Sequence, residues 1–526
     1  MDALPIHCPM RWILLSFLAL GLMGCGGSDE YTDSNQHLRL GNGAEPATLD
    51  FHRASGLTEL RILMALFEGL VVEHPSEDGG IAPGIAKSWD LSDDLLTYTF
   101  FLRPDAQWSD GQPILAQQFV DSARRVLDPD LGATLATHYD FVSGAADYRA
   151  RTITDFDQVG IQALDKHTLT MQLASPTPFF LQLLKQPVFY PYRDEMLNAE
   201  GMPTLFTGPF ILQEWTPNER LIVARNKNYV GPNAPQLDKI TFFPISDSGT
   251  EERAFRSGQI DYTAAVPPAS IQRLRGTGEP SYIESPHLAT AYMLFNTTEG
   301  PTADPELRRI LSLAIDRELI VNAVVGLGQP ATHFTPSAIA NHSPDESAKL
   351  RFDPETAKAA LDIWLQRNAK PSLTYSVSMN ENANKVAEAI QGMWREHLGL
   401  EVTIEQTEWR VFLNKLNSAD YDIGFLAWYG DYVDPYTFLN VFRSTSPTNR
   451  ARWTSEMYDA ALDKSLQTTG DERKYNLQAA ETLLMEALPI APVYWVSQPH
   501  RIATKLKNFP PKLLDWRSYH SVYLDP

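Results

Sequence analysis

The chain has 526 residues, of which 43% are hydrophobic and 10% aromatic, so it can bury several cores and should form two or three domains rather than remain disordered. Its formal net charge is -21, and such an acidic surface repels phosphate backbones and anionic lipid headgroups, which argues against nucleic-acid binding and a polybasic membrane contact. The only cysteines, Cys8 and Cys25, lie near the N-terminus, so disulfides, thiol catalysis and cysteine-ligated zinc sites are excluded from the rest of the chain.

The N-terminus has the pattern of a processed secretory segment. Arg11 precedes an apolar run at 12–23 that is shorter than the ~20 residues a membrane-spanning helix needs. Residues 22–25 (Leu-Met-Gly-Cys) follow, and they resemble a bacterial lipobox, in which the cysteine receives a diacylglycerol and becomes the first residue of the mature protein. We therefore expect a signal peptide at 1–24, lipidation of Cys25, a polar tether at 25–37, and anchoring to a bacterial membrane on its periplasmic or outer side. The alternative is an ordinary signal peptide that contains a cysteine.

Elements of both regular types are expected along the body of the chain. Residues 37–40 begin a short strand, and the turn formers at 43–50 indicate an irregular loop. Far downstream, Asp353 is placed to cap a helix whose first residue would be Pro354 and whose good helix formers extend to residue 365.

A β-α-β unit follows that helix. Hydrophobic alternation at 373–377 predicts a strand, and helical spacing at 386–394 predicts a helix that ends near Gly399. Alternation resumes at 400–404. Because several domains are expected and no Gly/Ser-rich linker separates them, we expect the chain to cross between domains more than once.

Motifs between residues 85 and 113 point to a known family. Tyr98, Phe100 and Leu102 alternate as in a half-buried strand, Gly111 suits a tight turn with positive φ, and the large aromatics Trp89 and Trp108 are expected in the core. Together with further segments in a fixed order, these residues resemble the oligopeptide and dipeptide solute-binding proteins of ABC importers (extracellular family 5), and the likeness extends from Leu38 to the C-terminus. The segments are 85–89 (IAKSW), 97–103 (TYTFFLR), 108–113 (WSDGQP), 208–210 (GPF), Trp215, 226–229 (NKNY), 255–261 (FRSGQID), 308–310 (RRI), 314–317 (AIDR) and 426–439 (LAWYGDYVDPYTFL).

The resemblance implies an α/β fold with two lobes, the type II periplasmic-binding-protein or Venus-flytrap fold, with a third domain inserted in lobe I. It implies that the lobes close on the ligand about a hinge. Family-like boundaries place lobe I at 38–67, 192–286 and 495–526, the inserted domain at 68–191, and lobe II at 287–494.

The resemblance also implies how a peptide would be held. Asp431 matches the family's acid that pairs with the α-ammonium of the ligand, and its alternative role is a solvated turn acid or a helix cap beside Pro435. Two strand-like stretches match those between which the peptide backbone lies as an added strand. They are Ser55, Gly56 and Leu57 on one side and Ala427, Trp428 and Tyr429 on the other.

Some of these positions have structural alternatives. Gly56 would allow close approach of the ligand backbone or be a plain turn glycine. Trp409 and Trp428 match aromatics that line side-chain pockets, and core packing explains each of them equally well.

The chain departs from the family at the positions that would neutralise the C-terminal carboxylate of a peptide. Several oligopeptide binders have basic residues there, and none of the matching residues in this chain is basic. They are Val325, Asn384, Leu416 and Phe425. Lys415 and Arg410 are nearby in sequence, and a ligand-contacting tyrosine of the inserted domain aligns with Leu135, close to Tyr139. The family's common cysteine pair falls on Ala289 and Tyr429.

The resemblance implies a monomeric binding protein that hands peptides to ABC transporter permease subunits, with no catalysis, cofactor or metal. The sequence lacks His-Glu-x-x-His, Gly-x-Ser-x-Gly and Walker motifs, and His52 and His138 are expected to be surface or satisfied interior residues. Two rivals stay open. One is the same fold binding an oligosaccharide, an opine or a nickel complex, and the other is a lipoprotein acting as a receptor or chaperone.

Overall fold

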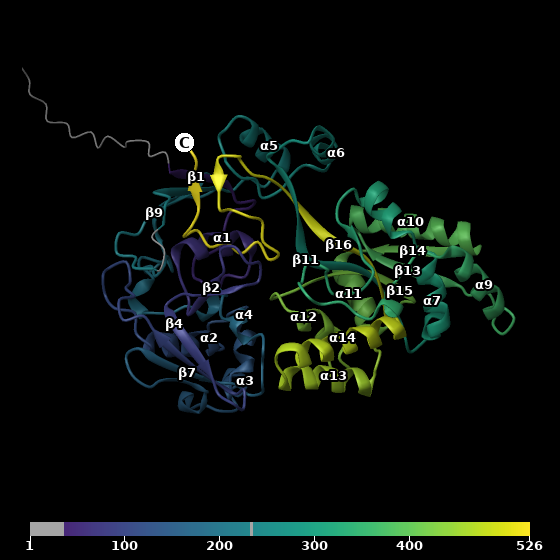
Figure 1. Ribbon diagram of the computed structural model, residues 1–526, viewed down its shortest axis with the longest axis horizontal. Helices are drawn as coiled ribbons and strands as arrows, with labels where there is room; N and C mark the ends of the chain where they lie inside the picture. Colours follow the sequence, from purple (N-terminus) through teal and green to yellow (C-terminus); the bar gives the residue numbers. More distant parts are fainter. Residues whose placement is uncertain (1–35, 232–234) are drawn as a thin grey trace, which may run out of the picture. The chain divides into compact units, whose positions relative to one another are not determined.

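The computed structural model describes residues 36–231 and 235–526 (Figure 1). All of them belong to one compact unit, Asn35–Pro526. Cys25, the predicted signal peptide and most of the tether lie outside the described residues and stay predictions. No helix in the described part of the chain is both long and apolar enough to cross a membrane.

Sheet 1 has four strands in the order β1-β10-β9-β8, with β1 parallel to β10 and the other pairs antiparallel. Leu38, Leu40, Val223 and Ile240 alternate inward on these strands and are almost wholly buried. The strand predicted to begin at His37 is confirmed as β1. The bounds are β1 (His37–Gly41), β8 (Phe210–Thr216), β9 (Arg220–Arg225) and β10 (Lys239–Phe243).

Sheet 2 is antiparallel, in the order β4-β5-β7-β6. The predicted alternation on β5 is confirmed, because Tyr98, Phe100 and Leu102 are buried, and Trp108 is fully buried in the same core. Gly111 has φ of +84° in the predicted turn. The bounds are β4 (Ala86–Leu91), β5 (Thr97–Leu102), β6 (Ile161–Ala163) and β7 (Thr168–Gln172), and a separate hairpin precedes them as β2 (Val71–Glu73) and β3 (Ile81–Pro83).

Sheet 3 has six strands in the order β12-β16-β11-β15-β13-β14. The predicted β-α-β unit is confirmed: β13 and β14 are parallel and α10 connects them, ending where Gly399 takes φ of +67°. The Asp353 side chain caps α9 by accepting a hydrogen bond from the N–H of Thr356, and Pro354 is the first helical residue. The bounds are β11 (Tyr282–Phe295), β12 (Gln329–Pro330), β13 (Leu373–Ser378), β14 (Val402–Thr407), β15 (Ile423–Tyr429) and β16 (Ile490–Arg501), with a small pair β17 (Leu506–Lys507) and β18 (Tyr523–Leu524).

Helices accompany all three sheets. The α-helices are α1 (Leu57–Leu66), α2 (Gln117–Leu127), α3 (Ala145–Arg149), α4 (Phe180–Leu183), α5 (Ser248–Arg256), α6 (Pro268–Thr277), α7 (Pro305–Leu313), α8 (Arg317–Leu319), α9 (Pro354–Trp364), α10 (Glu381–Leu398), α11 (Trp409–Ser418), α12 (Tyr436–Leu439), α13 (Glu456–Gln467) and α14 (Gly470–Ala487). Short 3-10 turns are η1 (Ala136–Phe141), η2 (Phe156–Gln158), η3 (Pro187–Phe189), η4 (Asp194–Met196), η5 (Pro301–Ala303), η7 (Glu346–Ala348) and η8 (Asn440–Phe442), and η6 (Ile320–Val325) is a π-helix.

Two long strands, β11 and β16, pair antiparallel over most of their length (Figure 1). Their register shifts between Pro286 and Thr290, which is an irregularity of the kind that bends a strand pair. The predicted lobe boundaries at 286/287 and 494/495 fall within these two strands. The exact division of the chain into lobes stays a prediction.

Candidate functional site

The loop that follows β15 carries Asp431 and is held at several points. The N–H of Gly430 donates to the carbonyl of Leu288 at 2.8 Å, and the N–H of Asp431 donates to Oγ1 of Thr437 at 3.1 Å. The indole N–H of Trp428 donates to the carbonyl of Thr437 at 2.9 Å. The loop therefore closes on itself through Thr437 and presents Asp431 at a fixed position.

The Asp431 carboxylate has no partner in the described part of the chain, although its backbone is bonded on both sides. Its side chain reaches solvent, yet the surrounding protein desolvates the carboxylate and raises its pKa, an effect that the nearby His138 opposes. Asp434, three residues on, differs. It accepts a hydrogen bond from the N–H of Tyr436 at 2.9 Å and a bidentate ion pair from Arg473 at 2.8 Å. The acid beside Pro435 that hydrogen-bonds to the first residue of α12 is thus Asp434, and Asp431 has no such bond among the described residues.

Residues of the segment 179–186, which follows the last strand of sheet 2 in the chain, pack against this loop. Phe179 stacks on Tyr432, with ring centroids 4.4 Å apart and planes at 7°, and on Tyr436 at 5.2 Å. The Gln186 amide donates to the backbone carbonyl of Asp431 at 3.4 Å. The Asp431 loop is therefore held both by β11, through Leu288, and by the segment 179–186.

A cavity of about 550 Å³ opens along β15, on the face of the strand that carries Phe425, Ala427 and Tyr429. No residue that lines it carries a formal charge at neutral pH, and its wall combines aromatic rings with amide and hydroxyl groups. Such a lining suits a ligand group that is neutral and partly apolar. The lining residues are Ala291, Ser378, Met379, Asn380, Asn382, Ala383, Trp409, Phe425, Leu426, Ala427, Tyr429 and Tyr494.

The two candidate tryptophans lie in different surroundings. Trp409, the first residue of α11, is 51% exposed and lines the cavity. Trp428 is half-buried, packs against the core and is bonded to Thr437, so it supports the Asp431 loop. Ala427 and Tyr429 point to the opposite face of β15 from Trp428, and both line the cavity with Trp409.

The stretch at Ser55, Gly56 and Leu57 differs from the strand-like form that the resemblance implied. Gly56 is extended, with φ of -91° and ψ of 156°, but Leu57 is already the first residue of α1, so this expectation is corrected. Gly56 does not need positive φ. A Cβ there would lie 2.4 Å from Oε2 of Glu59, whose other oxygen accepts from the N–H of Ala47 at 2.6 Å. This glycine makes room for a buried acid of its own helix.

The departures from the family pattern are visible in the structure. Lys415 is paired with Glu405 at 2.6 Å, whereas the exposed Arg410 side chain makes no ion pair among the described residues. Tyr139 is buried in the core, with its hydroxyl 3.5 Å from the Val188 carbonyl. Leu416 is also fully buried, and Phe425 lines the cavity.

The positions of Ala289 and Tyr429 give an independent check of the alignment by which Asp431 was matched to the family. Ala289 and Tyr429, the two positions that match the family's cysteine pair, lie directly opposite each other on β11 and β15. Cross-strand neighbours have Cβ atoms about 4.5–5.5 Å apart, close to the spacing of cystine, so the positions are compatible with a pair that this chain lacks. Asp431, two residues after Tyr429, shares that alignment.

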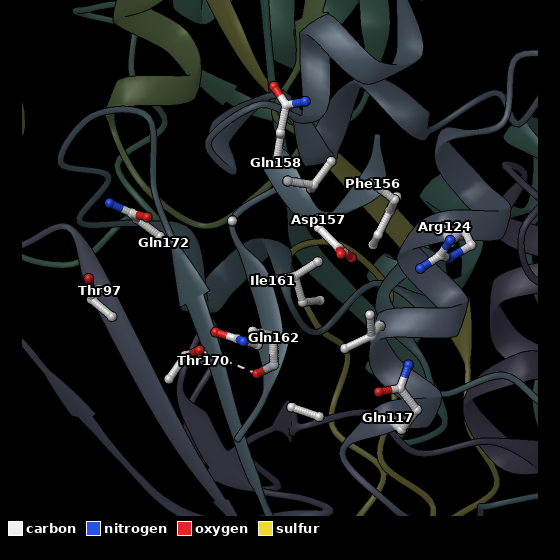
Figure 2. A pocket seen from close by; sticks show the side chains of 14 residues that line it. Thr97, Gln117, Arg124, Phe156, Asp157, Gln158, Ile161, Gln162, Thr170 and Gln172 are labelled. Carbon is white, nitrogen blue, oxygen red and sulfur yellow. Dashed lines mark hydrogen bonds between the residues drawn. The ribbon is translucent and has the colours of Figure 1, made fainter. Parts of the chain in front are cut away.

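A larger cavity, of about 640 Å³, lies elsewhere, between α2 and the β6 side of sheet 2 (Figure 2). Arg124 and Gln117 face it from the helix, and Gln162 and Thr170 face it from the strands. Its lining contains none of the predicted ligand-binding residues, and several of its side chains, among them Gln117, Arg124 and Gln162, are exposed to solvent. Volume alone therefore does not identify the binding site.

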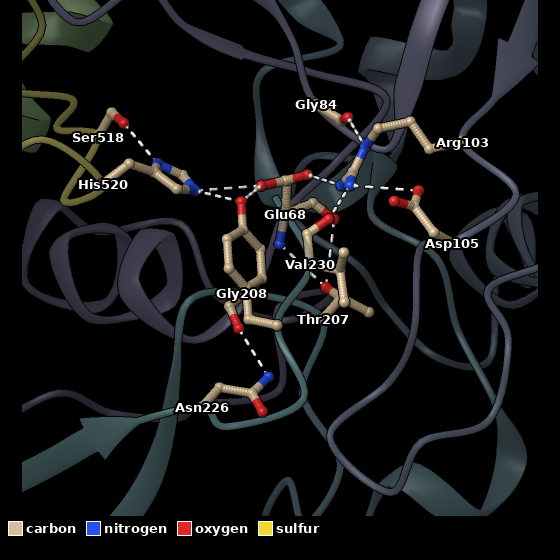
Figure 3. A network of polar contacts seen from close by, with 11 residues as sticks. Glu68, Gly84, Arg103, Asp105, Thr207, Gly208, Asn226, Val230, Ser518 and His520 are labelled. Atoms are coloured by element: carbon tan, nitrogen blue, oxygen red, sulfur yellow. Dashed lines mark hydrogen bonds and ion pairs between the residues drawn. The ribbon is translucent and has the colours of Figure 1, made fainter. Parts of the chain in front are cut away.

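Interior charges away from the Asp431 loop are largely neutralised by partners. Glu68 is paired with Arg103 at 3.1 Å and lies 3.2 Å from Nε2 of His520 (Figure 3). It also accepts a hydrogen bond from the Tyr229 hydroxyl at 2.5 Å. His52 is likewise a satisfied interior residue, because its ring bonds to Ser122 and Arg125. Among the described residues no three His, Cys, Asp or Glu side chains are grouped to hold a metal ion.

Several residues at this site were not singled out by sequence reasoning. Phe179, Gln186 and His138 come from segments more than 240 residues before Asp431. Met379 and Tyr494 line the cavity from still other elements. None belongs to a motif, so only the folded chain brings them together.

Comparison with known proteins agrees with this geometry. Residues 80–450 match the family described as bacterial extracellular solute-binding proteins, family 5 Middle. The periplasmic murein peptide-binding protein MppA of Escherichia coli (strain K12) is 36% identical over 484 residues, covering 89% of both chains, and the periplasmic oligopeptide-binding protein OppA of the same organism is 31% identical, covering 88% and 87%. The probable deoxycholate-binding periplasmic protein YgiS, also from Escherichia coli, is 30% identical over 88% of each chain.

The structural comparison extends over nearly the whole chain. The unliganded open form of MppA superposes with a TM-score of 0.84 at 33% identity, covering 93% of this chain and 98% of the other. The predicted α/β fold, two lobes of the type II periplasmic-binding-protein kind, is confirmed.

Proposed function

Because the chain belongs to the bacterial extracellular solute-binding proteins of family 5, we propose that it captures peptides outside the cytoplasmic membrane and delivers them to an ABC importer. The observation that carries the proposal is the unpartnered carboxylate of Asp431, fixed in the loop that follows Tyr429, which lines a cavity without formal charges. A free peptide presents an ammonium at one end and neutral backbone amides along its length. An acid without a cation of its own, next to a neutral wall, complements that pattern.

In this proposal Asp431 pairs with the ligand ammonium, and the peptide backbone lies along Ala427, Trp428 and Tyr429 on one side. Ser55, Gly56 and Leu57 face it from the other side. Trp409 and Tyr429 contact a ligand side chain in the 550 Å³ cavity. The relatives MppA and OppA, named as peptide-binding proteins, support peptides as the ligand class.

We place the lobes at the boundaries given by the family, with lobe I at 38–67, 192–286 and 495–526, the inserted domain at 68–191 and lobe II at 287–494. The paired strands β11 and β16 would then be the hinge about which the lobes close on the peptide. Closure needs a ligand that binds the closed form more tightly. Small-angle scattering should therefore give a smaller radius of gyration with peptide than without it.

The proposed location is periplasmic or at the cell surface, through a lipid on Cys25. The names of the relatives MppA, OppA and YgiS support the periplasm. Replacing Cys25 by Ser should move the protein from the membrane fraction to the soluble fraction, and mass spectrometry of the N-terminal peptide should show the loss of the diacylglycerol. We expect a monomer that contacts permease subunits and needs no cofactor. Incubation with peptides should release no cleavage products.

A second ligand class is suggested by one comparison and opposed by the site. YgiS is named as probably binding deoxycholate, an apolar organic acid, and an aromatic, uncharged cavity would suit such a molecule. Its carboxylate, however, would meet the unpartnered charge of Asp431 and be repelled. Peptides are favoured for that reason.

The deciding experiment is native mass spectrometry of protein purified from cells, followed by calorimetry with tripeptides that carry a free or an acetylated amino end. Co-purified free peptides, and loss of binding on acetylation, are the expected results. A bile acid, a sugar or a metal chelate in the site, or equal binding of acetylated peptides, would overturn the proposal.

A further inference from the structure

His138 lies at the edge of the Asp431 site in an unusual state. It belongs to the short turn η1, and the next residue, Tyr139, is fully buried and anchors this turn in the core. The imidazole of His138 is mostly buried, and its Nδ1 is shielded from water without a hydrogen-bond partner in the described part of the chain. A buried polar atom left without a partner costs stability, so such atoms often await a ligand or water.

Tyr139 packs on Phe189 of η3 with ring centroids 4.4 Å apart, and Gln186, just before η3, donates to the Asp431 carbonyl at 3.4 Å, so the turn that carries His138 lies near the Asp431 loop. The charges of the imidazole and of the Asp431 carboxylate act on each other. Burial lowers the pKa of His138, and the Asp431 charge opposes this. Three groups act on the imidazole: the Asp431 carboxylate, Asp140 on the same turn, and Gln186, whose side chain hydrogen-bonds to the ring as well as to the Asp431 carbonyl. The segments around sheet 2 thus bring two polar groups to the Asp431 loop, Gln186 and His138, and of these His138 is the one that can change its charge.

We propose that His138 is a second ligand-binding residue, whose neutral imidazole accepts a hydrogen bond from the same ligand ammonium that Asp431 pairs with. This inference rests on the proposed function and adds to it a contact from a segment about 290 residues away in sequence. The nearby tyrosine, Tyr139, is buried in the core and does not take this role.

The chemistry of an ammonium explains why a second acceptor matters. A primary ammonium has three N–H donors, and a single carboxylate cannot align with all of them. An unpartnered ring nitrogen beside the carboxylate satisfies another donor once water is excluded. The contact exists only while the imidazole is neutral, since an imidazolium has no acceptor and would repel the ligand.

This arrangement has a definite pH signature. As pH falls through the pKa of His138, which burial holds below the ordinary histidine value of about 6.5, protonation of His138 competes with the ligand ammonium and affinity falls. Asp431 acts in the same direction, because its protonation at acid pH removes the opposite charge. Two groups therefore contribute to the loss of affinity at acid pH. The contribution of His138 is the part that disappears when its imidazole is replaced by a side chain that does not titrate.

The test uses the mature full-length protein, tri-alanine with a free amino end, and isothermal titration calorimetry at several pH values between 5 and 8. His138→Leu should weaken binding by about ten- to a hundredfold at pH 7.5, as expected for a lost hydrogen bond to a charged group. His138→Gln keeps an acceptor, should lose less affinity, and should show a smaller drop on acidification than the wild type. His397→Gln, on α10 against Phe352 and away from the site, is the matched control and should leave affinity unchanged.

The outcomes separate the two proposals. If wild type binds tri-alanine and Asp431→Asn weakens binding while His138→Leu does not, the role of His138 is wrong and the peptide function stands. If wild type binds neither tri-alanine nor a free-amine tripeptide library, or if Asp431→Asn binds as well as wild type, the proposed function fails and this inference with it. Should His138→Leu melt below the assay temperature, the pH profile of His138→Gln decides: an acid sensitivity equal to that of wild type would overturn the inference.

Discussion

The Glu68 network and the Asp431 loop treat a carboxylate in opposite ways. At Glu68, burial alone would raise the pKa, but the hydrogen bond and charge of His520 and the charge of Arg103 lower it overall (Figure 3). At Asp431, burial raises the pKa and only His138 opposes it. One acid is neutralised within the fold, and the other is left for an incoming cation.

The comparison separates two uses of a carboxylate that the surrounding protein desolvates. A fully partnered acid stabilises the folded chain, because removing it leaves its partners unpaired. An unpartnered acid slightly destabilises the empty protein and returns that free energy when a ligand supplies the missing charge. Mutations at the two sites should therefore affect different measurements.

The largest expected effect is on stability at Glu68. Replacing Glu68 by Ala leaves Arg103, His520 and the Tyr229 hydroxyl without their shared acceptor and should lower the free energy of unfolding by about 3–5 kcal/mol. Urea unfolding followed by circular dichroism measures this. Peptide affinity of the protein that stays folded should be near that of the wild type. A variant that unfolds like the wild type would contradict the structural role of the network.

Asp431→Asn should show the reverse pattern. The binding free energy for free-amine peptides should weaken by about 2–5 kcal/mol. The free energy of unfolding should stay within about 1 kcal/mol of the wild type or rise, because a desolvated charge without a partner is removed. Calorimetry and urea unfolding give the two numbers on the same sample. A large loss of stability would assign Asp431 to the fold instead of to the ligand.

Glu251 is an intermediate case that sharpens the comparison. It is 1% exposed, and within the described part of the chain its carboxylate accepts hydrogen bonds only from the N–H groups of Ala264 and Ala265. Burial raises its pKa to about 7. The folded state then binds this proton more tightly than the unfolded chain does. Stability should therefore fall by about 3 kcal/mol as pH rises from the ordinary glutamate value to about 7, and stay level above it.

The measurement is urea unfolding at pH 4.5, 6 and 8 for wild type and Glu251→Gln. The glutamine variant should lose most of this decrease, whatever its absolute stability. Identical pH profiles for the two proteins would mean that the carboxylate is ionised throughout the range.

The smallest effects distinguish the two tryptophans. Trp409→Ala removes an exposed ring from the cavity wall and should lower the affinity for peptides with an apolar side chain by about tenfold. The free energy of unfolding should change by no more than about 0.5 kcal/mol. Trp428→Ala removes a half-buried ring and its bond to Thr437, and should lower stability by about 1–3 kcal/mol. Equal effects of the two substitutions on affinity and on stability would remove the distinction.

Local signals in the sequence predicted much of the fold correctly. The cap at Asp353, the strand at 373–377 and the C-terminal Gly399 follow from short-range patterns, and the structure has each of them. The stretch at Ser55, Gly56 and Leu57 was predicted less well, because its extended form ends at Gly56, where α1 begins. The N-cap position of a helix is itself extended, so a short match cannot distinguish it from a strand.

The sequence by itself determined which family the chain resembles and singled out Asp431, because a motif of consecutive residues fixes both the turn and the acid within it. The tertiary structure decided which acids are neutralised and which polar atoms are left over. Asp434 received Arg473, Glu68 received Arg103, and His138 came to lie beside Asp431 without a partner for its Nδ1. Such pairings depend on contacts between residues far apart in sequence, where desolvation and charge act through space and leave no local pattern.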